Sequence, residues 1–82
     1  MSFLIEPKLF ASNLRYFREH QSYSVAELAR LTDLIPSVIQ ALESGTHVPT
    51  EGQLTKIAAT LKVNHEQLVL PRPPEMEYFE GC

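Results

Sequence analysis

Residues 24–45 read SVAELARLTDLIPSVIQALESG. The order of polar and apolar residues in this segment is typical of two short consecutive helices. Ser24 and Glu27 have the spacing of a capping box at its start. In such a box the serine hydroxyl accepts from the backbone N–H three residues on, and the glutamate accepts from the N–H of the capping residue. The segment therefore predicts a helix over residues 25–32.

The second half of the segment predicts another helix, over residues 36–44. Pro36 suits the first position of a helix, where its missing N–H is not needed, and it drives the preceding residue out of the helical region. Gly45 suits the left-handed position that follows a helix end. Ala29 is small enough for the two helices to cross closely. Two short helices joined by a turn of three or four residues have helix-turn-helix spacing.

Helical patterns continue on both sides of this pair. Phe10, Leu14 and Phe17 repeat at spacings of four and three, which is typical of one buried helical stripe. Thr50 and Asn64 each begin a further capping pattern. The sequence thus predicts an all-α, compact five-helix bundle without a sheet, with helices over residues 7–20, 25–32, 36–44, 51–62 and 65–70. The predicted core consists of Phe10, Leu14, Phe17, Leu28, Ala29, Ile39, Leu42, Leu54, Ile57, Ala58, Leu61 and Leu68.

The length and composition predict one domain followed by a tail. The chain has 82 residues, 44% of them hydrophobic, which leaves no room for a second core. Residues 1–70 are expected to form the helix-turn-helix domain, and residues 71–82, PRPPEMEYFEGC, a Pro-rich acidic tail or linker. No apolar run approaches the ~20 residues of a membrane span, and no secretion signal precedes the domain. We therefore expect a cytoplasmic protein without membrane contact.

Catalytic and metal-binding patterns are missing from the sequence. Cys82 is the single cysteine, so neither an internal disulfide nor a cysteine zinc site can form, which fits a reducing compartment. His65 and Glu66 begin a His-Glu-x-x-His pattern, but position 69 is Val69 and the second ligand is lacking. Ser24 has no base partner. The sequence therefore predicts a protein that is not an enzyme and has no catalytic residue, no metal and no cofactor.

Several motifs together resemble the lambda-repressor-like (Cro and XRE) helix-turn-helix family. They cover about residues 9–69 and consist of Asn13-Leu-Arg-Tyr-Phe-Arg18, Ser24-x-x-Glu-Leu-Ala29, Ile39-x-x-Leu-Glu-Ser-Gly45, Pro49 and Leu54-x-x-Ile-Ala-x-x-Leu-x-Val63. The resemblance implies a sequence-specific DNA-binding transcriptional regulator of bacterial or phage type that performs no catalysis and binds double-stranded DNA.

The resemblance also implies which residues would touch DNA. Helix 36–44 would enter the major groove as the recognition helix, and helix 25–32 would cross the phosphate backbone. Base edges would be contacted by Pro36, Ser37, Gln40 and Ala41, among which Gln40 is suited to the two polar atoms of an adenine edge. Phosphates would be contacted by the helix start at Ser24 and Val25 through backbone N–H groups, and by Arg30, Thr46 and His47. Arg18 and Glu43 would form a structural ion pair.

Three departures from the family pattern leave a second interpretation open. Asp33 stands where relatives have glycine in the turn, and Ile35 stands where they have a serine or threonine cap. Residues 33–44 contain no Lys or Arg, and the whole chain has a net charge of −3. DNA binding would then depend on a basic strip of Lys8, Arg15 and Arg30, or on Lys62. The alternative is a protein-interaction module, antitoxin-like or the head of a larger regulator, with weak or no DNA binding.

The C-terminal segment predicts a homodimer through residues 64–79. One recognition helix offers few base contacts, so useful affinity needs two copies on half-sites ~34 Å apart. The apolar side chains expected at the interface are Val69, Leu70, Met76, Tyr78 and Phe79. Cys82 would then lie close enough to its mate to crosslink. If the acidic tail does not form a dimer interface, it is expected to bind a protein partner or to serve only as a linker.

Overall fold

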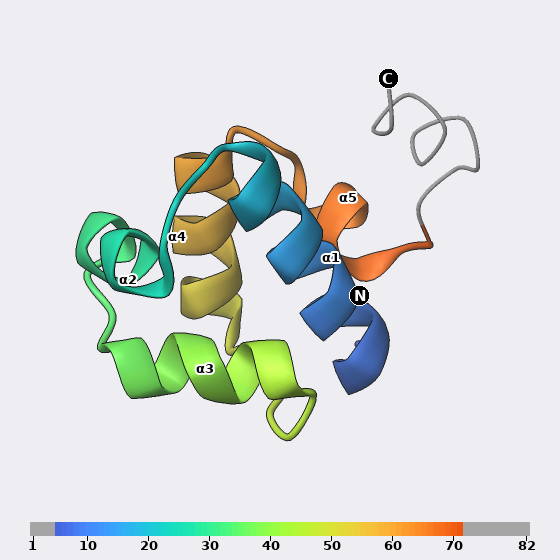
Figure 1. The fold of residues 1–82 in the computed structure, drawn as a ribbon. Helices are drawn as coiled ribbons and strands as arrows, with labels where there is room; N and C mark the ends of the chain where they lie inside the picture. Colours follow the sequence, from blue (N-terminus) through green and yellow to red (C-terminus); the bar gives the residue numbers. More distant parts are fainter. Residues whose placement is uncertain (1–4, 72–82) are drawn as a thin grey trace.

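Five α-helices make up the domain in the computed structural model, which describes residues 5–71 (Figure 1). They are α1 (Pro7–His20), α2 (Val25–Thr32), α3 (Pro36–Ser44), α4 (Glu51–Leu61) and α5 (His65–Val69). The described range contains no strand, so the predicted all-α bundle is confirmed. The last two helices each end one residue earlier than predicted. Lys62 is left-handed, at φ 61°, and Leu70 is extended.

The helix starts are fixed by side-chain caps. The boxes predicted at Ser24, Thr50 and Asn64 are all formed, each with reciprocal bonds to the residue three positions on. α1 has a cap that sequence reasoning did not identify, because the carboxylate of Glu6 accepts from the N–H of Leu9 at 2.7 Å. α3 alone among the five lacks a side-chain cap, since its N-cap residue is Ile35.

The turns between the helices use the left-handed backbone where the sequence indicated it. Asp33 ends α2 with φ 60° and ψ 36°, and Gly45 ends α3 with φ 80°. Aspartate tolerates this region better than most residues because its short polar side chain bonds locally. Ile35 is extended, at φ −86° and ψ 152°, as expected before proline. The turn therefore keeps the helix-turn-helix course without glycine.

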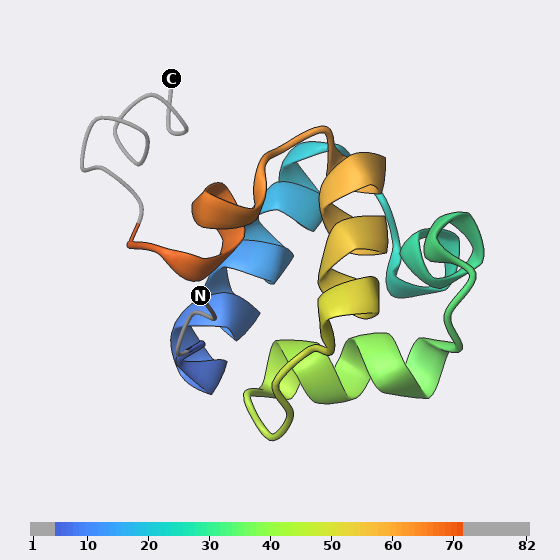
Figure 2. The ribbon, with the colours of Figure 1, turned by 180° about the vertical axis from the view of Figure 1, so that it is seen from behind.

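α3 lies along one side of the domain. α1 packs against α3 and α5, while α2 packs against α3 and α4. In Figures 1 and 2, α3 runs across the base of the molecule, and α1 and α4 rise away from it. One side of α3 therefore faces its neighbours, while the other side is left uncovered.

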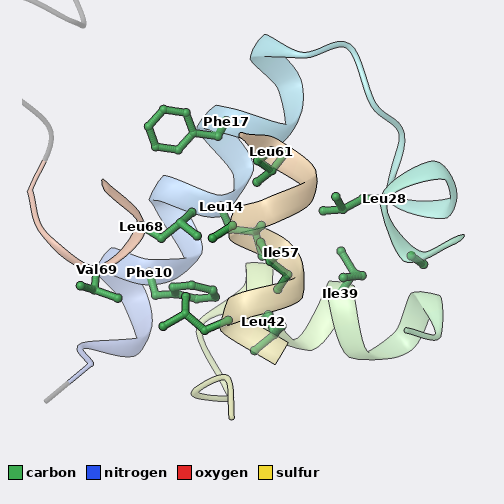
Figure 3. Packing of buried hydrophobic residues seen from close by; sticks show 13 residues of the cluster. Phe10, Leu14, Phe17, Leu28, Ile39, Leu42, Ile57, Leu61, Leu68 and Val69 are labelled. Atoms are coloured by element: carbon green, nitrogen blue, oxygen red, sulfur yellow. The ribbon is translucent and has the colours of Figure 1, made fainter. Parts of the chain in front are cut away.

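The core contains every residue that the periodicity predicted (Figure 3). Ala11 and Val69 are buried as well. The prediction that Val69 belongs to a dimer surface is therefore wrong: its side chain is 6% exposed because it joins the core cluster, and Leu70, 48% exposed, is its outward neighbour.

One fully buried polar side chain, Asn13, ties α1 to the C-terminal end of the domain. Its Nδ2 donates to the backbone oxygens of Leu68 and Leu70, both at 2.9 Å. A buried amide needs such partners, since an unmet polar group in the core is costly. Asn13 therefore fixes where the chain leaves α5.

Candidate nucleic-acid interface

The uncovered side of α3 is polar and contains the residues predicted to read bases. Ile39 and Leu42 are buried, whereas Pro36, Ser37 and Gln40 are exposed and Ala41 is half-buried at the edge. Residues three, four and seven positions apart share a face of a helix, so these side chains stand together.

The same reasoning adds a residue that the sequence interpretation missed. Ser44 is exposed and follows Ser37 by seven positions, which places it on the same face. Its hydroxyl donates to the carbonyl oxygen of Ala41 at 2.8 Å. The seven-residue spacing was the signal that could have identified it.

The loop after α3 is fastened to the last turn of that helix. The hydroxyl oxygen of Thr46 lies 2.9 Å from that of Ser44, and it donates to the carbonyl oxygen of Ala41 at 3.2 Å. Nδ1 of His47 lies 3.2 Å from the same hydroxyl. This network presents His47 at the edge of a hollow of about 370 Å³. The hollow is lined by Ser37, Val38, Ala41, Leu42, His47, Val48, Thr50 and Gln53.

The start of α2 has two backbone donors to offer. The Val25 side chain is half-buried against the core, and the Ser24 hydroxyl is occupied by its capping bond to the N–H of Glu27 at 3.0 Å. No hydrogen bond within residues 5–71 uses the N–H groups of Val25 and Ala26. A phosphate could therefore be contacted here only by the backbone, as the sequence interpretation required.

Glu27 places a negative charge at this same helix end. The backbone N–H of Ser24 donates to its carboxylate at 2.8 Å, and this hydrogen bond lowers the pKa of Glu27 below its ordinary value. The carboxylate is therefore ionised at neutral pH. It stabilises the helix but opposes an approaching phosphate.

An ion pair joins α1 to α3 behind the polar face. Nε of Arg18 lies 2.5 Å from one carboxylate oxygen of Glu43, and a terminal nitrogen donates to the other at 3.0 Å. Both side chains are largely buried, at 12% and 11% exposure. The hydrogen bond to Glu43 raises the pKa of Arg18, although burial opposes this effect. A further donation from Arg18 to the carbonyl oxygen of Tyr23, at 2.8 Å, holds the guanidinium in place.

Apart from Arg18, the cations that the sequence offered for DNA contact belong to different elements around α3. Lys8 and Arg15 of α1 line a groove at its C-terminal end, and Arg30 of α2 lies near its N-terminal end, where the Arg30 carbonyl accepts from the N–H of Asp33. Lys62 follows the C-terminal end of α4, which lies across the domain from α3 (Figure 2). Two cationic flanks therefore border α3 in place of one continuous strip.

The described residues were also compared for net charge, for metal-binding clusters and for membrane-spanning helices. Residues 5–71 contain six Lys or Arg and seven Asp or Glu, a net charge of −1, against −3 for the whole chain. Within that range, no cluster of three or more His, Cys, Asp or Glu side chains is arranged to hold a metal ion. None of its helices combines the length and the apolarity that a membrane crossing requires.

The sequence matches a helix-turn-helix family, HTH_3, over residues 14–68. The chain belongs to this family. HTH_3 proteins are DNA-binding, non-enzymatic regulators that often form dimers. The match confirms the resemblance to lambda-repressor-like proteins that the motifs indicated. A comparison with curated proteins gives no match.

Solved structures share the HTH_3 fold. A hypothetical transcription factor, NHTF, from Neisseria is 27% identical with a TM-score of 0.77, covering 98% of this chain and 95% of that one. The restriction-modification controller protein C.AhdI from Aeromonas hydrophila is 26% identical with a TM-score of 0.71, covering 74% of this chain and 92% of its own.

A third structure contains the same fold within a longer chain. Apo-HppE is 31% identical with a TM-score of 0.74 over 80% of this chain, but the alignment covers only 37% of HppE. HppE has also been solved in complex with a substrate. The likeness extends to one segment of HppE, and most of that protein has no counterpart here.

Proposed function

We propose that this HTH_3 protein is a sequence-specific transcriptional regulator of bacterial or phage type that inserts α3 into the major groove of DNA. The observation that supports this most directly is the uncovered polar face of α3, with Ser37 and Gln40 opposite the buried Ile39 and Leu42. Two similar structures, from Neisseria and Aeromonas hydrophila, are described as a hypothetical transcription factor and a controller protein. A bacterial regulator acts in the cytoplasm, where the chromosome lies.

Base recognition is assigned to the exposed residues of α3. The amide of Gln40 can donate to N7 or accept from N6 of adenine, and the paired contact reads that base in the major groove. Ser37 supplies a short hydroxyl, and Pro36 and Ala41 supply apolar contacts suited to a thymine methyl group. Such contacts discriminate among bases although α3 contains no Lys or Arg.

Phosphate contacts are assigned to the elements that flank α3. The N–H groups at the start of α2, at Val25 beside the Ser24 cap, point to one strand, with Arg30 as the cation on that side. Thr46 and His47 stand at the other end, where their hydrogen-bond network fixes the loop. These contacts set the register of α3 in the groove.

The active form is proposed to be a homodimer that binds two half-sites ~34 Å apart. Leu70 is the exposed apolar residue next to α5 and marks the start of the interface. Met76, Tyr78, Phe79 and Cys82 lie outside the described residues, and their part in the interface remains a proposal. The division into a domain of residues 1–70 and a tail of residues 71–82 is likewise a proposal. Sedimentation of the whole chain at tens of micromolar should give twice the monomer mass, and deletion after Leu70 should remove the association.

Selection from a random duplex library tests the proposed function. The whole chain should enrich duplexes with a paired, approximately palindromic motif, and the affinity for them should fall steeply as salt rises. An unenriched library, together with no duplex binding at 50 mM salt, would overturn the proposal.

An unenriched library and no duplex binding would favour a second function, that of a protein-interaction module. The absence of Lys and Arg from residues 33–44, and the carboxylate of Glu27 at the start of α2, are the features that support this second function. The acidic tail is then the surface for a protein partner.

A further inference from the structure

An open groove separates the N-terminal part of α1 from the C-terminal end of α3. It has a volume of about 470 Å³ and lies beside the loop that begins at Gly45. Its lining consists of Lys8, Ala11, Ser12, Arg15, Tyr16 and Glu19 from α1, with Glu43, Ser44 and Gly45 from the end of α3.

The stem of Lys8 lies directly against the end of α3. A Cβ atom added to Gly45 would stand 3.3 Å from Cγ and 3.6 Å from Cα of Lys8. Glycine at this position therefore serves two purposes, since it accepts the left-handed φ of 80° and leaves room for the lysine stem. The contact places the first part of the Lys8 side chain beside Gly45, where the loop that contains Thr46 and His47 begins.

The carboxylates of the groove are already paired. Glu43 is bound through both oxygens by Arg18, and Glu19 lies 3.2 Å from Arg15 and 3.8 Å from Arg18. None of the ion pairs within residues 5–71 includes Lys8. The lining holds two cations and two carboxylates, but Glu43 is already neutralised by Arg18, which lies outside the lining, and Glu19 is paired with Arg15. The charge of Lys8 is therefore the one in the lining that no ion pair of the described residues balances.

The position of the groove fits the second strand of a duplex in contact with α3. A helix of nine residues is about 13.5 Å long, and the major groove is about 12 Å wide. The two ends of α3 therefore approach the phosphates on opposite sides of the major groove. Arg30 lies near one end and Lys8 at the other.

We propose that the groove between α1 and α3 is a phosphodiester-binding site, with Lys8 as its cation. This proposal rests on the proposed DNA-binding function and adds a contact outside the helix-turn-helix. Lys8 and Arg30 hold the two strands on either side of α3, and they supply the positive charge that α3 itself lacks. Arg15, paired with Glu19, contributes less.

Salt titration with a 20-base-pair duplex of mixed sequence tests the site without knowledge of the operator. Lys8→Gln should reduce the slope of log affinity against log salt by about 0.9, so that its loss relative to wild type is about 3.5-fold larger at 50 mM than at 200 mM. Lys56→Gln is the matched control, because Lys56 is an exposed lysine on α4. It should retain more of the slope than Lys8→Gln. Lys8→Arg should keep the wild-type slope.

Three outcomes separate the alternatives. A wild-type slope for Lys8→Gln overturns the site while leaving the proposed function intact. Equal slopes for the variants at positions 8 and 56 also overturn it, because the effect is then one of net charge. Failure of the wild-type chain to bind the duplex overturns both proposals. Lys8 also lies near the negative end of α3, so the thermal midpoint is measured in parallel. A shift in stability with an unchanged slope shows a purely structural role.

Discussion

Arg18 and Glu43, 25 positions apart in the sequence, are joined by two hydrogen bonds, of 2.5 and 3.0 Å, across the contact between α1 and α3. The pair ties α3 to α1 from behind, where both side chains are largely buried. Its geometry is bidentate, which is the arrangement that makes an arginine–carboxylate pair strong and directional.

Removal of one partner should destabilise the domain strongly. Glu43→Ala leaves the Arg18 guanidinium largely buried without its counter-ion, at a cost of about 3 kcal/mol. Urea denaturation measures this change. Glu19→Ala, which removes an exposed partner of Arg15, is the control and should cost less than about 1 kcal/mol. Similar midpoints for the two variants would contradict a structural role for the buried pair.

Asn13 offers a second test of stability. Asn13→Leu keeps the approximate side-chain size but leaves the carbonyl oxygens of Leu68 and Leu70 without their donor, so unfolding should become easier by about 2 kcal/mol. Thermal unfolding followed by circular dichroism gives the change. Asn13→Asp should also destabilise the domain, because a buried carboxylate cannot donate to the two carbonyl oxygens and a protonated carboxyl group can donate to only one of them. Wild-type stability of both variants would contradict a stabilising role for the hydrogen bonds from Asn13 to Leu68 and Leu70.

Acid should weaken the domain through Glu27. Hydrogen bonding from Ser24 lowers the pKa of Glu27 in the folded state. Its contribution is therefore present above the unfolded pKa, near 4.5, and is lost as the pH falls through the lower folded value. Urea midpoints between pH 3 and pH 7 should show this decline. Glu27→Gln keeps the cap and should lack this component of the slope, while an unchanged pH profile would assign the decline to other carboxylates.

Substitutions at the proposed DNA interface should have two different effects, loss of base preference and loss of overall affinity. Gln40→Ala should relax the preference at one base position by about 1 to 3 kcal/mol. Arg30→Ala should weaken all sequences alike and lower the salt slope by about 1. Binding to the selected motif and to single-base variants of it, at two salt concentrations, measures both effects. Equal losses of base preference would show that the two roles are wrongly assigned.

Local patterns were sufficient to predict most of the fold. Capping boxes such as Ser24 with Glu27 are contained within four residues, and Pro36 and Gly45 act on their own backbone. Apolar spacing identified the twelve predicted core residues because a helix repeats its inner face at fixed intervals. On α3 the periodicity identified the buried Ile39 and Leu42, whereas the residues of the opposite face were implied by the family resemblance.

Contacts between distant segments were not predictable in this way. Asn13 has an ordinary helical context, and its acceptors lie 55 and 57 positions away. Val69 stands at the end of a five-residue helix that is too short to show a periodic stripe, so its burial depends on the packing of α5 against α1 and α4. The approach of Lys8 to Gly45 likewise arises from the crossing of α1 and α3.

α1 holds both Asn13 and Arg18, and through them it fastens α5 and α3 to one rigid element. A five-residue helix has no independent stability in water, so α5 can persist only while α1 is in place. Opening of α1 therefore releases α3 and α5 together. The slowest backbone amides of α1, α3 and α5 should accordingly exchange with deuterium at one common free energy, as a single cooperative unit in which α3 does not unfold separately.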